Sequence, residues 1–129
     1  SNQLGVRTDV SQTTGSIADD AAANIQFAGF KSYTLYKVQT SAAAWVTLYT
    51  SPATRTADAS RNINTDPANG SGVIAEVITT GAQTQLITPA TIGFNDDNPV
   101  TTTIYAKAVN KSGSTQNITV TLTILQLET

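Results

Sequence analysis

Residues 117–128, NITVTLTILQLE, alternate between apolar and polar side chains over most of their length, and this pattern most constrains the fold. On an extended strand the apolar residues of the alternation share one face, and the threonines between them share the other. These apolar residues are Ile118, Val120, Leu122 and Ile124. The chain holds 23 threonines in 129 residues, and β-branched side chains favour strands over helices. The sequence therefore predicts an all-β fold.

Six further segments have strand-like composition and are bounded by turn residues. They are residues 23–27, 31–40, 45–50, 73–79, 84–88 and 102–109. Most connections are short and contain glycine, but the linkers 51–72 and 93–99 are longer. This mixture predicts an antiparallel β-sandwich, jelly-roll-like, with seven strands, or eight if part of the N-terminal segment pairs. A helix longer than one turn is expected nowhere, except within residues 51–61 or near residues 21–23.

Residues 1–19 are polar, and we expect them to form an extended N-terminal arm outside the sandwich domain of residues 20–129. The arm's larger apolar residues, too scattered to form a core stripe, are Leu4, Val6, Val10 and Ile17. Such an arm is either mobile or becomes ordered by lying on a partner subunit. A chain of this length is expected to contain one hydrophobic core.

Composition argues against several classes of partner. Seven basic and nine acidic residues give a net charge of −2 without a lysine or arginine cluster, so we expect no nucleic-acid partner. No apolar stretch approaches the roughly 20 residues that span a bilayer, so we expect no membrane insertion. Cysteine is absent, which excludes disulfides and thiolate metal sites within the chain.

An enzyme is not expected, because the chain has no histidine or cysteine and only two glutamates. Glu76 lies within the apolar run VIAEVI, out of phase with its apolar neighbours. We expect it to point outward or to pair with a lysine or arginine. A glycosidase needs two carboxylates that face one sugar, and no second carboxylate is placed opposite Glu76. We therefore expect no catalytic residue, no cofactor and no bound metal.

The linker 51–72 is rich in Asp, Asn, Gly and Pro, which are the residues of long surface loops. Its spacing does not match a calcium-binding EF-hand loop. A less regular calcium site stays open only if both long linkers meet at one end of the sandwich. Its oxygen ligands would be Asp58, Asp66, Asn69, Asp96 and Asp97. We expect instead an exposed contact loop.

Aromatic side chains on residues 45–50 suggest a second type of contact. If Val46 and Leu48 face the core, Trp45 and Tyr49 form an outward pair that binds a glycan or a neighbouring subunit. Packing of the same pair against the second sheet is the alternative. At the C-terminal end the alternation shifts, which favours docking on a neighbour. The candidate contacts are Trp45, Tyr49, Arg55, Arg61, Leu125 and Leu127.

Residues 27–128 are similar to a module in virion structural proteins of tailed bacteriophages, particularly cyanophages. The most distinctive stretches are SAAAWV, GVIAEVITTGAQT, NKSGST and TVTLTILQLE. The resemblance implies a non-enzymatic component of the virion surface, either a capsid decoration (cement) protein or a tail accessory. We expect a homo-oligomer, a trimer, in contact with major capsid or tail proteins. The alternative is a carbohydrate- or receptor-binding module, a host adhesin of a phage tail.

Overall fold

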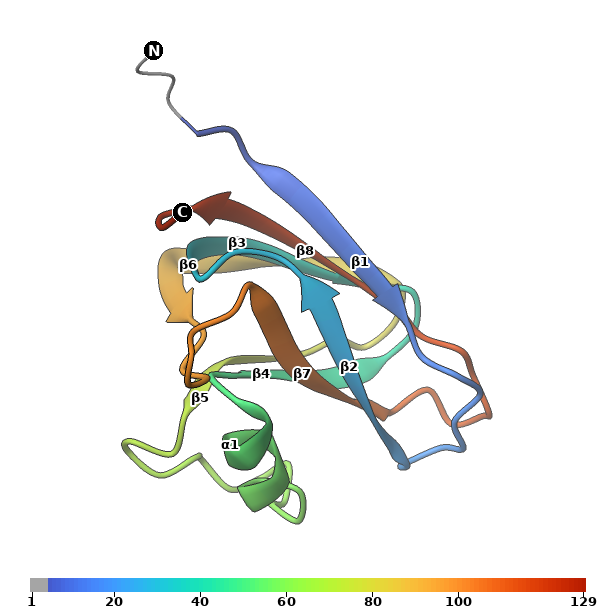
Figure 1. Cartoon of the computed structure of the whole chain (residues 1–129). Coiled ribbons are helices and arrows are strands. Elements are labelled where there is room, and N and C mark those ends of the chain that lie inside the picture. Colours follow the sequence, from blue (N-terminus) through green and yellow to red (C-terminus); the bar gives the residue numbers. More distant parts are fainter. Residues whose placement is uncertain (1–4) are drawn as a thin grey trace.

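The computed structural model describes residues 5–129, and across them eight strands form two antiparallel four-stranded sheets that face each other (Figure 1). The strand order is β1-β8-β3-β6 in one sheet and β2-β7-β4-β5 in the other. The predicted all-β sandwich is therefore confirmed. The elements are β1 (Thr8–Thr13), β2 (Ala22–Ala28), β3 (Ser32–Thr40), β4 (Ala44–Tyr49), α1 (Pro52–Ala57), β5 (Val73–Ile78), β6 (Gln83–Phe94), β7 (Thr103–Asn110) and β8 (Thr119–Gln126).

The strands pair as a folded double ribbon, with β1 beside β8, β2 beside β7, β3 beside β6 and β4 beside β5. This nested pairing is the jelly-roll order. All seven segments predicted as strands are strands, but β6 is longer than expected and continues to Phe94. The register between β3 and β6 shifts between Leu35 and Lys37, which leaves residues 87–90 of β6 outside the ladder. Pro89 lies in this unpaired stretch, where its missing N–H breaks no ladder hydrogen bond, so the strand can continue past it.

The core lies between the two sheets. The four apolar residues of the β8 alternation are fully buried, as the pattern predicts. Val46 and Leu48 of β4 also face the core, so Trp45 and Tyr49 point to the outer side of their sheet. Other large side chains that fill the core are Phe27, Tyr33, Leu35, Val38 and Ile104.

Part of the N-terminal segment pairs and forms the eighth strand that the sequence allowed, so residues 8–17 belong to the sandwich and not to a free arm. β1 pairs with β8 from Thr8 opposite Ile124 to Thr13 opposite Thr119, and Ile17 bridges to Gln116. An edge strand buries only part of one face, so the few apolar residues of this segment suffice, and cross-strand hydroxyl pairs add support. Leu4 lies outside the described residues.

Both long linkers lie at the same end of the sandwich. The backbone N–H of Asp96 donates to the carbonyl of Thr50 over 2.8 Å, which joins them directly. The beginning of β1 and the end of β8 lie at this end as well (Figure 1). We call it the long-loop end, formed by residues 29–31, 50–72 and 95–102. Within residues 5–129, no helix has both the length and the apolar character needed to cross a membrane.

Candidate functional site

The outer side of the β2-β7-β4-β5 sheet is covered by the linker that was expected to be exposed. This linker begins with α1, whose N-terminus is capped by Ser51: its side chain accepts from the backbone N–H of Thr54 over 3.2 Å. Pro52 occupies the first turn, where its missing N–H costs nothing. Figure 1 shows α1 beside β4 and β7, on the side away from β1 and β8.

Charged side chains attach the linker to the sheet through a group that we call the anchor cluster. Its members are Trp45, Tyr49, Asp58, Arg61, Glu76 and Lys107. Arg61 holds two carboxylates, because its Nε lies 2.7 Å from Asp58 Oδ1 and its Nη2 lies 2.7 Å from Glu76 Oε2. The Tyr49 hydroxyl donates to Asp58 Oδ2 over 2.5 Å.

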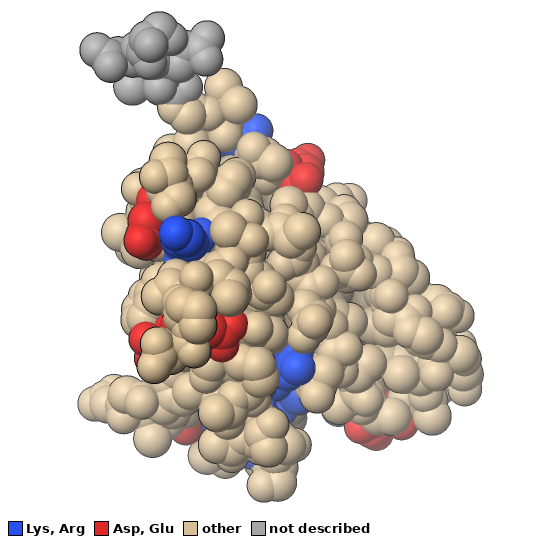
Figure 2. Space-filling model, viewed as in Figure 1, with Lys and Arg blue, Asp and Glu red and all other residues tan. Residues whose placement is uncertain are grey.

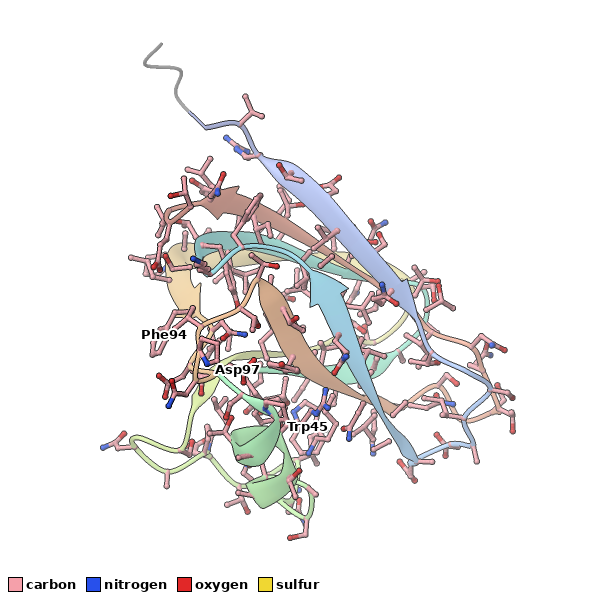
Figure 3. All side chains as sticks on the ribbon, in the orientation of Figure 1. Trp45, Phe94 and Asp97 are labelled. Atoms are coloured by element: carbon pink, nitrogen blue, oxygen red, sulfur yellow. The ribbon has the colours of Figure 1, made fainter. Side chains whose placement is uncertain are left out.

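Trp45 forms the floor of the anchor cluster. Its Nε1 donates to Glu76 Oε2 over 3.0 Å, and the ring lies 5.2 Å below the Arg61 guanidinium. The Lys107 ammonium lies 5.1 Å from the same ring and donates to the backbone carbonyl of Asp58 over 3.0 Å. Figure 3 shows Trp45 beside α1. Cation–π contacts of this kind are strongest where water is excluded.

The charges in the anchor cluster are mutually compensated. Burial alone would raise the pKa of Asp58, but the hydrogen bonds from Arg61 and Tyr49 outweigh it and hold this pKa below its usual value. Burial, together with the neighbouring Asp58 carboxylate, raises the pKa of Tyr49. Burial lowers the pKa of Lys107, and the attraction of Asp58 opposes this shift only in part. The arrangement therefore fixes the linker to the sheet.

The expected outward pair of Trp45 and Tyr49 is not available to a ligand. Trp45 is only 5% exposed and Tyr49 only 1%; Arg61 lies over the Trp45 ring, and Asp58 accepts from the Tyr49 hydroxyl. Arg61 is engaged with Asp58 and Glu76. The expected pairing of Glu76 with a basic side chain is confirmed. The expectation of a wholly exposed linker 51–72 is wrong for its first part.

The remaining three candidate contacts have different surroundings. Arg55 donates from Nη1 to the carbonyl of Ile25 over 3.1 Å and lies 5.3 Å from the Tyr105 ring, so it also holds α1 to the sheet. Leu125 is half-buried beside Gly5. Leu127 is 49% exposed.

The two linkers meet, as an irregular calcium site would require, but Asp58 is already bound by Arg61 and Tyr49. Asp97 accepts hydrogen bonds from the Tyr105 hydroxyl over 2.6 Å and from Thr101 over 3.1 Å. No group of three or more acidic side chains suited to a metal ion occurs in the part of the chain that the structure describes.

Exposed apolar residues flank the strand β1 at the long-loop end. Val6, just before β1, is 77% exposed, and Leu127, just after β8, is 49% exposed; because β1 and β8 are antiparallel, both residues lie at this end of the sheet. The other edge of β1 has no strand partner among residues 5–129. We call Val6, Leu127 and the free edge of β1 the terminal corner. Figure 2 shows one face of the molecule, on which charged side chains are few and scattered.

A cleft of about 520 Å³ also opens at the long-loop end, between the linker 51–72 and the last residues of β6. Its lining residues include Thr54, Asn69, Ser71, Ile74, Ile92, Phe94 and Asp96. This cleft was missed from the sequence because the strand was expected to end at residue 88 and Phe94 was placed in the linker 93–99, whereas β6 continues to Phe94. The alternation of Ile92, Gly93 and Phe94 was the available signal of an extended strand.

No protein-family model matches the chain, and no curated protein matches it in sequence.

Proposed function

We propose that this chain is a non-enzymatic structural protein of the bacteriophage virion surface, on the capsid or the tail, and that it acts by adhesion between subunits. The terminal corner is the observation that carries the proposal. An edge strand presents unpaired N–H and C=O groups to a neighbouring chain. The exposed side chains of Val6 and Leu127 at the same end of the sheet would add apolar area to the contact.

Three further observations support the proposal. Jelly-roll sandwiches occur among viral capsid domains, although a fold alone does not determine a function. The module resemblance of residues 27–128 to phage virion proteins points in the same direction. The acidic groups of the anchor cluster are bound by Arg61 and Tyr49, which favours a structural role for them.

The partners would be further copies of the chain and neighbouring capsid or tail proteins. A contact between the β1 edge and a different surface of the next copy is heterologous, and heterologous contacts that close give cyclic oligomers. A trimer is the expected closed form. The expected location is the particle surface.

Cosedimentation with phage particles that lack this protein tests the proposal. The wild-type chain is expected to sediment with the particles, and a Val6→Ser, Leu127→Ser double variant is expected to stay in the supernatant. Because both side chains are exposed, the variant should keep its fold, which circular dichroism checks. Leu86→Ser is the matched control, since Leu86 is 57% exposed but lies on β6, at the opposite edge of the same sheet. Equal binding by the double variant and the control would contradict the proposed surface.

A further inference from the structure

We infer that the cleft at the long-loop end binds a neutral oligosaccharide. The inference does not rest on the proposed function, because the cleft contains none of the residues of the terminal corner. Its volume of about 520 Å³ falls within the range of roughly 300–1,000 Å³ that is typical of small-ligand sites.

An apolar platform forms one wall of the cleft. Phe94 is 49% exposed at the end of β6, and Ile92 precedes it on the same side of the strand. Figure 3 shows Phe94 pointing away from the body of the sandwich. Ile74 of β5 lines the cleft as well. An exposed aromatic ring can pack against the C–H groups on one face of a pyranose. The hydroxyls of the sugar lie at the edge of its ring and stay free for hydrogen bonds.

Polar groups with free hydrogen-bonding capacity lie beside this platform. The side chains of Asn69, Ser71 and Asp96 line the cleft and make no hydrogen bond to any other residue of the described range 5–129. Together an amide, a hydroxyl and a carboxylate supply both donors and acceptors. Sugar hydroxyls need both, because each hydroxyl donates one hydrogen bond and accepts others.

The charge of the cleft selects among saccharides. Asp96 is its one ionisable side chain, and no lysine or arginine of the described chain lines it. A carboxylate repels sulfated, sialylated and uronic-acid sugars, whereas it accepts charge-assisted hydrogen bonds from neutral hydroxyls. A neutral oligosaccharide is therefore the ligand class that fits.

The two walls are held in place, as a binding site requires. The buried Asn95 lies between Phe94 and Asp96, and its side chain donates to Thr101 over 2.9 Å and to the carbonyl of Thr103 over 2.8 Å. On the other wall, the carbonyl of Gly72 accepts from the Thr50 N–H over 3.0 Å.

Gly72 makes this close approach possible. Its φ of +85° suits glycine, and a Cβ added there would lie 2.4 Å from Thr54 Cγ2. The anchor cluster holds the remainder of the linker on the sheet. The cleft is therefore formed before any ligand arrives.

A printed array of neutral and acidic oligosaccharides tests the inference with the full chain. The neutral glycan with the strongest signal is then titrated into the ¹⁵N-labelled protein. Amide shifts are expected to concentrate at residues 69–74 and 92–96. Phe94→Ala and Asp96→Ala are each expected to weaken binding by about ten-fold or more. Leu86→Ala is the matched control, because Leu86 is an exposed apolar residue of the same strand outside the cleft, and it should bind as wild type.

Three results would overturn the inference: no binding to any neutral glycan on the array, amide shifts confined to other surfaces, or stronger binding of acidic than of neutral glycans. The ¹⁵N spectra of the variants show whether each keeps the native fold. Loss of particle cosedimentation in the terminal-corner variant, with glycan binding intact, would separate this site from the proposed adhesion.

Discussion

Arg61, which follows α1, reaches the middle of β5 and lies 2.7 Å from the carboxylate of Glu76. This contact ties the long linker to the edge strand of its sheet. The same guanidinium binds Asp58 over 2.7 Å, so one side chain joins the two carboxylates of the anchor cluster. The position of the linker, and with it one wall of the cleft, depends on this arginine.

Arg61→Ala should lower the free energy of unfolding by about 3 kcal/mol, because it removes the cation nearest to both carboxylates in a largely buried site and leaves Asp58 only with Lys107 at 3.8 Å. Urea denaturation measures the loss. Lys111→Ala is the matched control, since Lys111 also pairs with a carboxylate, that of Asp20 at 2.6 Å, but in an exposed position. Its removal should change stability little. Similar losses in the two variants would show that the anchor cluster contributes no more than a surface ion pair.

Fluorescence of Trp45, the one tryptophan of the chain, should report the position of the linker. In the native protein the ring is covered, so quenching by acrylamide should be weak. In Arg61→Ala the linker loses its principal attachment, and quenching should rise before the protein unfolds globally. Strong quenching in the wild-type protein would contradict the covered position of Trp45.

Stability should fall as the pH drops below about 4. The pKa of Asp58 is lowered in the folded protein from its ordinary value of 3.8, and so is that of Asp97, chiefly through the hydrogen bond from Tyr105. Folding then favours the ionised form. The stabilisation is present above the unfolded-state pKa and is lost as the pH falls through the folded-state pKa. Urea midpoints between pH 6 and pH 2 measure this, and Asp58→Asn should show a shallower decline; an unchanged slope would count against the assignment.

Gly93→Ala should destabilise the sandwich by about 1–3 kcal/mol. A Cβ at this position would lie 2.6 Å from Cζ and from the hydroxyl oxygen of Tyr33, which is buried in the core and cannot move away freely. Thermal unfolding measures the effect. Gly81→Ala is the control, because its added Cβ would meet nothing within 4 Å. A stable Gly93→Ala protein would show that β6 approaches β3 less closely than described.

The strands that were predicted correctly can be recognised from the apolar and polar pattern of their own residues. In β8 the alternation from Ile118 to Ile124 needs no knowledge of the partner strands, and the structure buries all four apolar residues of that alternation. β1 lacked such a signal, because an edge strand needs few apolar residues, and its pairing with β8 joins residues more than a hundred positions apart. The continuation of β6 was missed because a proline usually ends a strand. Here Pro89 lies where the register between β3 and β6 shifts and the two strands are not paired.

The candidate site could be predicted only in part. The face of β4 on which Trp45 and Tyr49 lie was predicted correctly, since both point away from the core. Their exposure was not, because it depends on a linker that folds back over them. The linker's composition indicates a solvated loop, and the contact of Arg61 with Glu76 joins residues that only the tertiary fold brings together. The cleft was not predictable for the same reason, because its walls come from two distant segments.

The copy number of this chain in purified phage particles, measured by quantitative mass spectrometry against the major capsid protein, tests the proposed virion function most directly. We predict a fixed ratio that survives repeated purification, large if the chain covers the capsid lattice and small if it belongs to the tail. A ratio that falls toward zero with each purification step would contradict the proposal that this jelly-roll sandwich is a structural component of the particle.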